Sequence, residues 1–447
     1  MNTPICDFAR DYAQRQALRL HMPGHKGVPT LGVEHLDITE LDGADSLYEA
    51  SGIIRQSEEN AGSLFGCPTF YSTEGSSQCI RAMLYLVLQY ALQQGRPPRI
   101  AAARNVHKTF LSAAALLDLD VTWLYPAQAD SYLSCRLTPQ ELDAFLSSAD
   151  ELPAAVYLTS PDYLGTLADI GAIAQVCHRH SVLLAVDNAH GAYLKFLSPS
   201  CHPMDLGADL CCDSAHKTLP VLTGGAYLHI SPNAPALLAE QAKNALALFG
   251  STSPSYLILQ SLDAANRYLA CGYPERLAEL VQQVHALKAS LTDHGYCLYG
   301  DEPIKITLCP KPYGYIGDEF AALLVEENIF CEFHDPDFVV FMVTPETGKE
   351  GLDRLKKVLL SIPAREAIEC KPPECCRCQR VTSIREAVLA PCETIAAQDS
   401  AGRILAAASV GCPPAVPIVV CGERINDAAI QCFSYYGITE CTVMTSR

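Results

Sequence analysis

Lys217 stands next to His216 between two apolar runs, in the stretch CCDSAHKTLPVLTGGAYLHI (211–230). A solvated surface position is the ordinary interpretation of a lysine in an arbitrary context. A lysine that must lose its proton to attack a carbonyl group needs a partly desolvated position, and the boundary between two buried strands supplies one. Lys217 is therefore a candidate amine nucleophile.

Further polar residues fall where predicted strands end or helices begin. Asp187 ends the apolar run LLAVD, where an unpaired carboxylate would be costly, so it should meet a cationic or hydrogen-bonding partner. Ser76 and Ser77 open a predicted helix, and hydroxyls beside the positive end of a helix dipole could bind a phosphate. Taken alone, an ordinary N-cap is the more frequent role for such serines. The set is completed by His107, His190, Ser214 and His216.

These residue types together suit one cofactor. A phosphate site, a buried carboxylate, a flat imidazole and an amine nucleophile are the groups that anchor, protonate, stack on and covalently hold pyridoxal phosphate. The sequence therefore predicts that Lys217 links this cofactor and that Asp187 pairs with its ring nitrogen.

Alternating strand and helix signals must position these groups. The segment SSQCIRAMLYLVLQYALQQG predicts a helix that begins at serines and ends at Gly95. The run LTPQELDAFLSSADEL predicts another, because Thr138 and Glu141 form a capping box with Pro139 at the first helical position. Strands are predicted at RIAAA and VTWLYP, on either side of a helix near 108–117, and at PAAVYLTS, SVLLAVDN, ADLCCDS and GGAYLHI. This alternation predicts an α/β fold with a parallel or mixed sheet covered on both faces, where ligands bind beyond the strand ends.

The length of 447 residues predicts several domains. We predict an N-terminal segment (1–65), a cofactor-binding large domain (66–300), a small α+β domain (301–364) and a C-terminal α+β domain (365–447). In the last of these, GCPPAVPIVVCGERIN predicts a turn, a strand, a turn and a helix.

Composition excludes several classes of function. Thirty-two basic against fifty acidic residues give a net charge of −18, which disfavours nucleic acid and anionic lipid as partners. No run of eighteen apolar residues or secretory leader is recognisable, so we expect neither membrane insertion nor export, and we place the protein in the cytoplasm. The twenty-one cysteines are then expected to stay reduced.

Two groups of residues raise the question of a metal site. Cys370, Cys375, Cys376 and Cys378 have enough thiols, but their spacing beside two prolines favours a linker with incidental cysteines. His21 and His25 in HMPGHKG have the spacing of helical ligands, yet Pro23 and Gly24 make a helix improbable. We therefore predict no metal.

At these residues the sequence resembles a known family. HMPGHKG, DITE, FGCPTFYSTEGSSQCIRAML, ARNVHKTF, YLTSPDYLGTLADI, AVDNAHGAY, DSAHKTL and CPPAVPIVVCGERI occur in the order found in the Orn/Lys/Arg decarboxylase family of fold type I. The chain is similar to the short members, which lack an N-terminal receiver-like domain. The resemblance implies an aspartate aminotransferase-like large domain and pyridoxal phosphate as cofactor. It also implies a homodimer or higher homo-oligomer, in which a second subunit approaches the site near HMPGHKG.

The resemblance also assigns roles to individual residues. Lys217 matches the lysine that holds the cofactor covalently, Asp187 the partner of the ring nitrogen and His107 the imidazole stacked on the ring. Ala189 is expected against the ring face and His190 near the ring hydroxyl. Positions around the phosphate are matched by Ser76, Ser77, Ser214 and His216. Glu423 is a candidate partner for the distal cation of a substrate.

The implied reaction is decarboxylation of a small basic amino acid (lysine, arginine or ornithine) with release of CO2 and a di- or polyamine precursor. Two departures stand out: Asn188 where a glutamate is common, and Gly224 where a glutamine is common. An aminotransferase, another lyase of fold type I, or an inactive homologue that regulates a relative remain alternatives.

Overall fold

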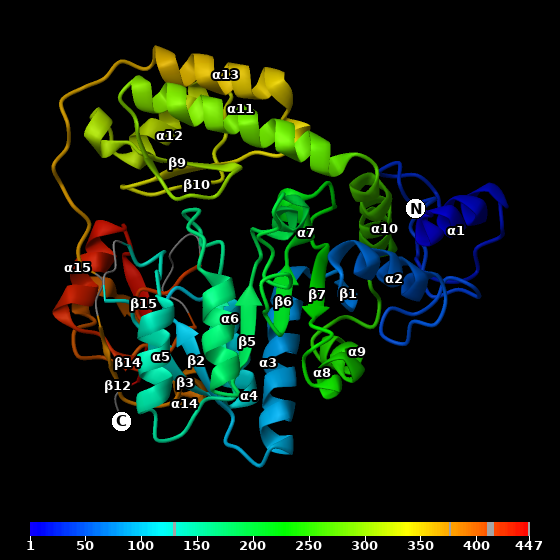
Figure 1. Cartoon of the computed structure of the whole chain (residues 1–447), viewed down its shortest axis with the longest axis horizontal. Helices are drawn as coiled ribbons and strands as arrows, with labels where there is room; N and C mark the ends of the chain where they lie inside the picture. The colour runs from blue at the N-terminus through cyan, green and yellow to red at the C-terminus, as the bar shows by residue number, and fades with distance from the viewer. Residues whose placement is uncertain (128–130, 375–376, 409–414, 446–447) are drawn as a thin grey trace. The chain divides into compact units, whose positions relative to one another are not determined.

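The computed structural model (Figure 1) describes residues 1–127, 131–374, 377–408 and 415–445. It contains two compact units. The first unit comprises residues 1–97, 154–156 and 170–276, and the second comprises 98–153, 157–169 and 277–447. Among the described residues, none of the helices has the length and apolar character that crossing a membrane requires. The predicted domain boundaries at 65, 300 and 364 stay predictions.

The first unit contains a mixed four-strand segment of sheet in the order β1-β7-β6-β5. β5 and β6 run parallel with Asp187 opposite Cys212, whereas β7 is antiparallel to both β6 and β1. The carboxyl ends of β5 and β6 therefore meet at one edge. The strands are β1 (Thr69–Ser72), β5 (Leu183–Asp187), β6 (Leu210–Asp213) and β7 (Ala226–Ile230).

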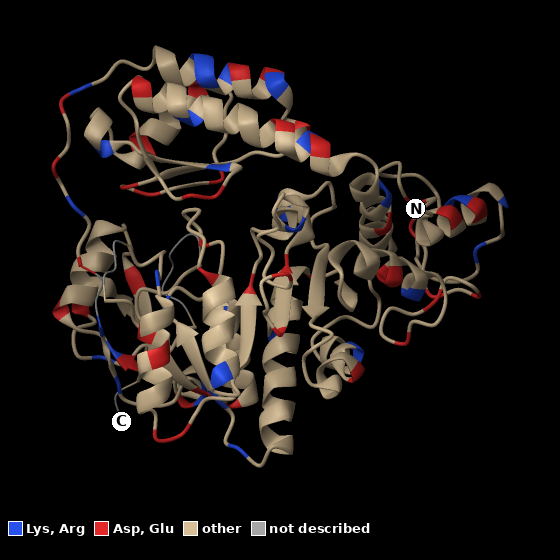
Figure 2. Cartoon of the chain, viewed as in Figure 1, with Lys and Arg blue, Asp and Glu red and all other residues tan. Residues whose placement is uncertain are grey.

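Helix α3 covers this part of the sheet, packing on β6 and β7 and on α9. It carries one charged residue, Arg81, and is drawn almost wholly in tan in Figure 2, as expected for a helix buried against a sheet. The helices of the first unit are α1 (Pro4–Gln14), α2 (Ile53–Phe65), α3 (Gly75–Gln93), α6 (Ile170–Arg179), the 3-10 helix η1 (Ala192–Phe196), α7 (Ala215–Thr218), α8 (Ala236–Glu240), α9 (Ala242–Ala247) and α10 (Tyr256–Ala270).

The second unit begins with two parallel strands joined by a helix, as the sequence predicts. The capping box at the start of the next helix is confirmed, because the Thr138 hydroxyl accepts from the Glu141 backbone N–H at 3.2 Å and the Glu141 carboxylate accepts from the Thr138 N–H at 2.8 Å. The elements are β2 (Arg99–Ala103), α4 (Lys108–Leu117), β3 (Asp120–Leu124), α5 (Pro139–Ser148) and β4 (Ala155–Thr159), within which the chain passes between the units.

A separate antiparallel sheet with strand order β10-β11-β9-β8 follows in the second unit. Helix α13 carries basic and acidic residues interspersed along its length (Figure 2), while Leu352, Leu355 and Leu359 form its buried face. The elements are α11 (Tyr273–Asp293, which begins in the first unit), β8 (Cys297–Tyr299), β9 (Lys305–Cys309), η2 (Lys311–Tyr313), α12 (Gly317–Glu326), β10 (Phe333–His334), β11 (Val339–Met342), η3 (Pro345–Thr347) and α13 (Gly348–Ser361).

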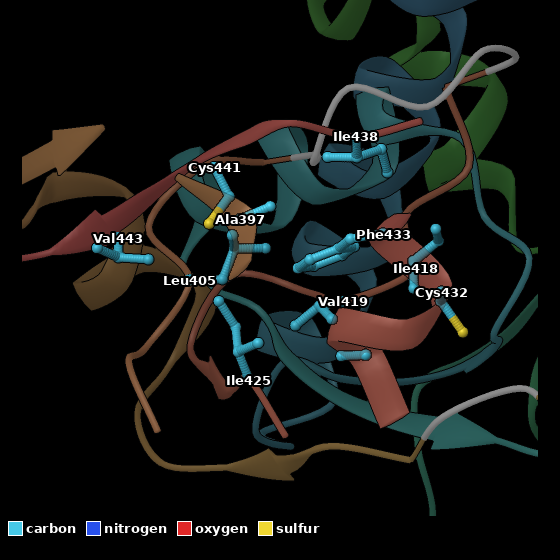
Figure 3. Packing of buried hydrophobic residues seen from close by; sticks show 11 residues of the cluster. Ala397, Leu405, Ile418, Val419, Ile425, Cys432, Phe433, Ile438, Cys441 and Val443 are labelled. Atoms are coloured by element: carbon cyan, nitrogen blue, oxygen red, sulfur yellow. The ribbon is translucent and has the colours of Figure 1, made fainter. Parts of the chain in front are cut away.

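The C-terminal part of the second unit has its own hydrophobic core. Phe433 of α15 lies among Leu405, Val419 and further apolar side chains (Figure 3). The elements are β12 (Gln379–Arg380), α14 (Ile384–Leu389), β13 (Cys392–Ala396), η4 (Ala397–Asp399), β14 (Glu423–Arg424), α15 (Asp427–Tyr435) and β15 (Glu440–Met444).

The strand predicted within PAVPIVV is wrong for its described residues, 415–420, which form no strand. The carbonyls of Pro417 and Ile418 accept hydrogen bonds from the guanidinium of Arg104, at 2.8 and 2.9 Å, instead of from a neighbouring strand. The predicted α/β fold with a mixed sheet is confirmed by the parallel β5/β6 and β2/β3 pairs beside antiparallel β7.

Candidate active site

Lys217 lies on α7, a single helical turn between β6 and β7, and its side chain is half-buried. Its Nζ lies 2.9 Å from Nε2 of His190, which is itself buried. The backbone N–H of Lys217 donates to the Ser214 carbonyl at 3.0 Å, which fixes the turn. An amine in contact with an imidazole in a partly desolvated place has a nearby group to exchange its proton with, as a nucleophilic amine requires.

Asp187 is the last residue of β5 and is only 2 % exposed. Its Oδ1 accepts from the Ala189 backbone N–H at 3.2 Å and contacts the Cys212 thiol at 3.7 Å. Ala189 and His190 follow directly and are buried as well. A carboxylate in such a place suits a cationic ring nitrogen, because a buried negative charge is stabilised by a positive partner.

The predicted phosphate cradle brings two segments together. Ser214, which precedes α7, donates from its Oγ to the Oγ of Ser76 at 2.7 Å. Ser76 and Ser77 lie inside the first turn of α3, whose N-cap residue is Glu74, so the ordinary N-cap role does not apply to these serines. The hydroxyls therefore lie at the positive end of a nineteen-residue helix, where an anion is favoured.

Gly224 shapes this cradle, which explains one departure noted in the sequence. Its φ is +99°, and its carbonyl accepts from the Gly75 N–H at 2.7 Å. A Cβ at position 224 would lie 2.8 Å from the Thr73 carbonyl oxygen. A glutamine would clash there, so the local backbone of this chain requires glycine.

His216 is oriented by the same loop. Its Nδ1 lies 3.0 Å from the Gly225 carbonyl, which can only accept, so Nδ1 carries a proton. The ring is half-buried. Its role near the phosphate stays a prediction.

His107 and Glu423 belong to the second unit, whereas the other eight predicted site residues belong to the first. His107 is the N-cap of α4, and its Nδ1 accepts from the Thr109 backbone N–H at 3.2 Å. The loop that carries it is tied to the C-terminal part of the same unit, since the Lys108 N–H donates to the Ala415 carbonyl at 2.8 Å. Stacking of His107 on a cofactor ring stays a prediction.

Glu423 is buried and already has partners. Its Oε2 accepts from the Val420 N–H at 2.8 Å and lies 3.6 Å from Nη2 of Arg104. Burial raises the pKa of Glu423, and Arg104 opposes that shift. A substrate cation at this carboxylate, which stays a prediction, would compete with Arg104.

The structure describes the surroundings of both groups of candidate metal ligands. Residues 21–27 form turns rather than a helix, as Pro23 and Gly24 predict. Nε2 of His25 instead lies 3.1 Å from Oδ2 of Asp37. Of the four clustered cysteines, Cys375 and Cys376 lie outside the described residues, while Cys370 is exposed and Cys378 is half-buried.

Three buried polar residues beside the site, His202, Asp213 and His229, are not identified from the sequence, and Asn188 is marked there only as a departure from the family pattern. Asp213 carries the same signal as Asp187, since it too is a carboxylate that ends an apolar run. Nothing in the spacing of His202 and His229 indicates that both reach Asp213.

Comparison with known proteins gives consistent results. The major domain of Orn/Lys/Arg decarboxylases matches residues 3–307, and the C-terminal domain of the same family matches residues 373–443. An arginine decarboxylase of Bacillus subtilis is 27% identical over 464 residues, covering 96% of this chain and 92% of that protein. An arginine decarboxylase of Halalkalibacterium halodurans is also 27% identical, over 467 residues, covering 95% and 91%.

Among solved structures, the lysine decarboxylase of Francisella novicida superimposes with a TM-score of 0.81 at 16% identity, covering 99% of this chain and 81% of that one. Lysine decarboxylase A of Pseudomonas aeruginosa gives a TM-score of 0.78 at 17% identity, covering 97% and 76%. These likenesses show a shared fold. Since the family models together span most of the chain, this protein belongs to the Orn/Lys/Arg decarboxylase family of enzymes.

Proposed function

We propose that this protein is a pyridoxal phosphate-dependent decarboxylase that converts a basic amino acid into the corresponding amine and CO2. The observation that carries the proposal is Lys217 on its tight turn, half-buried, with Nζ 2.9 Å from His190. The family and its fold neighbours supply the reaction class, and the residues beside Lys217 fit the cofactor.

The fit rests on three features of the first unit. The hydroxyls of Ser76 and Ser214 at the start of α3 suit a phosphate, Asp187 offers a buried carboxylate, and Lys217 offers an amine. When bound, pyridoxal phosphate supplies an electron sink for the bond between Cα and the carboxylate.

Each side chain then has a defined task. Asp187 holds a proton on the ring nitrogen, because its own charge is stabilised there in turn. Ser76 and Ser214 hold the phosphate and so fix the orientation in which the carboxylate bond is aligned for cleavage. Lys217 takes and returns protons, and His190 at 2.9 Å is its exchange partner.

We propose arginine as the first candidate substrate. The two curated relatives compared above, which match nearly the whole chain, are named arginine decarboxylases, whereas the two solved structures are lysine decarboxylases at lower identity. Lysine and ornithine therefore belong in the same assay.

We further propose a homodimer in the cytoplasm. Leu18, Leu20 and Leu31 of the N-terminal segment are each more than four-fifths exposed. Burial of these side chains against a second subunit would remove their apolar surface from water.

The test is an assay of purified protein with added pyridoxal phosphate against arginine, lysine and ornithine labelled at the carboxyl carbon. We expect labelled CO2 from at least one substrate and the matching amine by mass spectrometry. Cofactor that binds without CO2 release would favour another fold type I reaction, and absence of cofactor binding would favour an inactive homologue.

The matched variant is Lys217→Ala. We expect it to lose turnover by at least about 10³-fold, because both the covalent anchor and the proton carrier are gone. Borohydride reduction should attach a pyridoxyl group to residue 217 in the wild type and not in the variant. Substantial turnover by the variant would contradict the role of Lys217.

A further inference from the structure

The core of the first unit contains a polar cluster to which the proposed reaction gives no task. Asp213, His202, His229 and Asn188 each have an exposed fraction of 0 %. Asp213 is the last residue of β6, directly before Ser214, and Asn188 directly follows Asp187. The cluster therefore adjoins both strand ends that carry the candidate site.

The carboxylate of Asp213 joins the cluster. Its Oδ2 accepts from Nε2 of His202 at 3.0 Å and from Nε2 of His229 at 3.1 Å. Its Oδ1 accepts from Nδ2 of Asn188 at 2.7 Å. Burial alone would raise the pKa of Asp213, but the two imidazoles outweigh it and hold that pKa well below its usual range.

The hydrogen-bond partners of His229 are compatible with a doubly protonated ring beside the Asp213 carboxylate. The Thr69 hydroxyl lies 3.1 Å from the Cys67 carbonyl and 2.9 Å from Nδ1 of His229. When its one proton is donated to the carbonyl, which can only accept, the hydroxyl accepts from Nδ1. In that arrangement both nitrogens of His229 carry protons and the ring is an imidazolium. Burial opposes this charge, yet Asp213 raises the pKa of His229 overall.

His202 has the other protonation state. Its Nδ1 accepts from the Met204 N–H at 3.3 Å, so its single proton is on Nε2, the atom that faces Asp213. With His229 doubly protonated, the cluster contains one negative and one positive charge and is neutral as a whole. A buried ion pair with this many hydrogen bonds is strongly oriented.

Asn188 completes the arrangement and accounts for the second departure noted in the sequence. Its side chain is confined against Gly191, where a Cβ would lie 2.0 Å from Asn188 Oδ1. A glutamate at position 188 would direct a second carboxylate at Asp213, and like charges in a buried place repel strongly. Asn188 and Asp213 therefore form a matched pair.

We infer that Asp213 is a positioning residue, which through Asn188 and Ser214 sets the strand ends that present Asp187 and Lys217 to the cofactor. This inference rests on the proposed function. A metal ion bound by His202, Cys211 and Asp213 is the competing interpretation, since ligand atoms of these three lie within 4.8 Å of one another. In the hydrogen-bond pattern described above, Nε2 of His202 donates to Asp213, so an ion bound through these two atoms would have to displace that proton.

The experiment exchanges the amide and the carboxylate between positions 188 and 213. Asn188→Asp directs two carboxylates at each other, and Asp213→Asn removes the charge that holds His229. In the double variant, the amide introduced at position 213 can donate to the carboxylate introduced at position 188, while the amide oxygen accepts from the histidines. The matched control is Asp209→Asn, which removes a buried carboxylate that binds Leu184 N–H and His178 at the other end of β6.

Affinity for pyridoxal phosphate is measured by titrating cofactor-free protein. We expect Asn188→Asp to weaken binding about 10- to 100-fold, the double variant to recover most of this loss, and Asp209→Asn to bind like the wild type. Wild-type affinity in Asn188→Asp, or no recovery in the double variant, would overturn the inference.

Two measurements on cofactor-free protein separate this inference from the proposed function. Nitrogen-15 NMR of labelled histidines should show one residue protonated on both nitrogens at neutral pH, and this signal should disappear in His229→Gln. Elemental analysis should find no stoichiometric zinc. A zinc ion lost in Asp213→Asn would overturn the inference, whereas failure of the wild type to bind pyridoxal phosphate would overturn the proposed function and leave the NMR result standing.

Discussion

Two buried aspartates, one in each unit, differ in ionisation although both are removed from water. Asp213 in the first unit has its pKa lowered, while Asp335 in the second unit has its pKa raised to about 7. Asp213 faces two imidazoles and an amide.

Asp335 accepts from the backbone N–H groups of Asp337 and Phe338, both at 2.8 Å, through a single oxygen. Burial is the main cause of its shift, and the adjacent Asp337 carboxylate adds to it. The nearby cation, Lys311, pairs with Asp337 at 2.7 Å instead. Burial raises the pKa of both carboxyl groups, and the partners that each group meets decide whether that rise is overcome.

The largest effect on stability is expected from Asp213→Ala. It leaves the buried imidazolium of His229 without its counter-charge, and we expect the free energy of unfolding to fall by about 3–5 kcal/mol. Urea unfolding of cofactor-free protein measures the change. A loss below about 1 kcal/mol, the scale of one ordinary hydrogen bond, would mean that the cluster is not ionic.

The second test measures how the ionisation of Asp335 makes the free energy of unfolding depend on pH. Its pKa is about 7 in the folded protein against 3.8 in the unfolded chain, so the protonated acid stabilises the folded state at low pH, and this contribution is lost as pH rises towards 7. Relative to Asp335→Asn, the wild type should lose about 2 kcal/mol of unfolding free energy between about pH 5 and pH 7. Parallel stability profiles for the two proteins would contradict the raised pKa.

The smallest effect concerns Asp318, an exposed carboxylate that raises the pKa of Asp335 slightly. Asp318→Asn should move the midpoint of the Asp335 transition down by about 0.2–0.5 pH unit, the effect of an exposed charge worth roughly 0.3–0.7 kcal/mol. High salt should abolish this difference between variant and wild type. A larger shift would show that distant charges, and not direct partners, control Asp335.

Local signals account for what the sequence predicted correctly. The capping box at Thr138 and the strands ending at Asp187 and Asp213 depend on neighbours in the chain, and the structure contains them as expected. Lys217 was singled out because its flanking segments are apolar, which is also a local property.

Contacts between distant segments account for what the sequence did not predict. His202 and His229 reach Asp213 only because the fold brings the segment after η1 together with β6 and β7, and no periodicity encodes that meeting. The wrong strand at 415–420 has a similar cause, since Arg104 lies more than three hundred residues away and occupies its carbonyls. Ser76 pairs with Ser214, 138 residues further along, for the same reason.

Three hydrogen bonds between distant segments have an evolutionary consequence. Arg104 donates to the carbonyls of Pro417 and Ile418, and the Lys108 N–H donates to that of Ala415. A gene shortened before residue 415 would leave a guanidinium and a peptide N–H without these acceptors, a few residues from the imidazole of His107. We therefore expect the C-terminal segment and the turn after β2 to be inherited together, because loss or replacement of either one removes these hydrogen bonds.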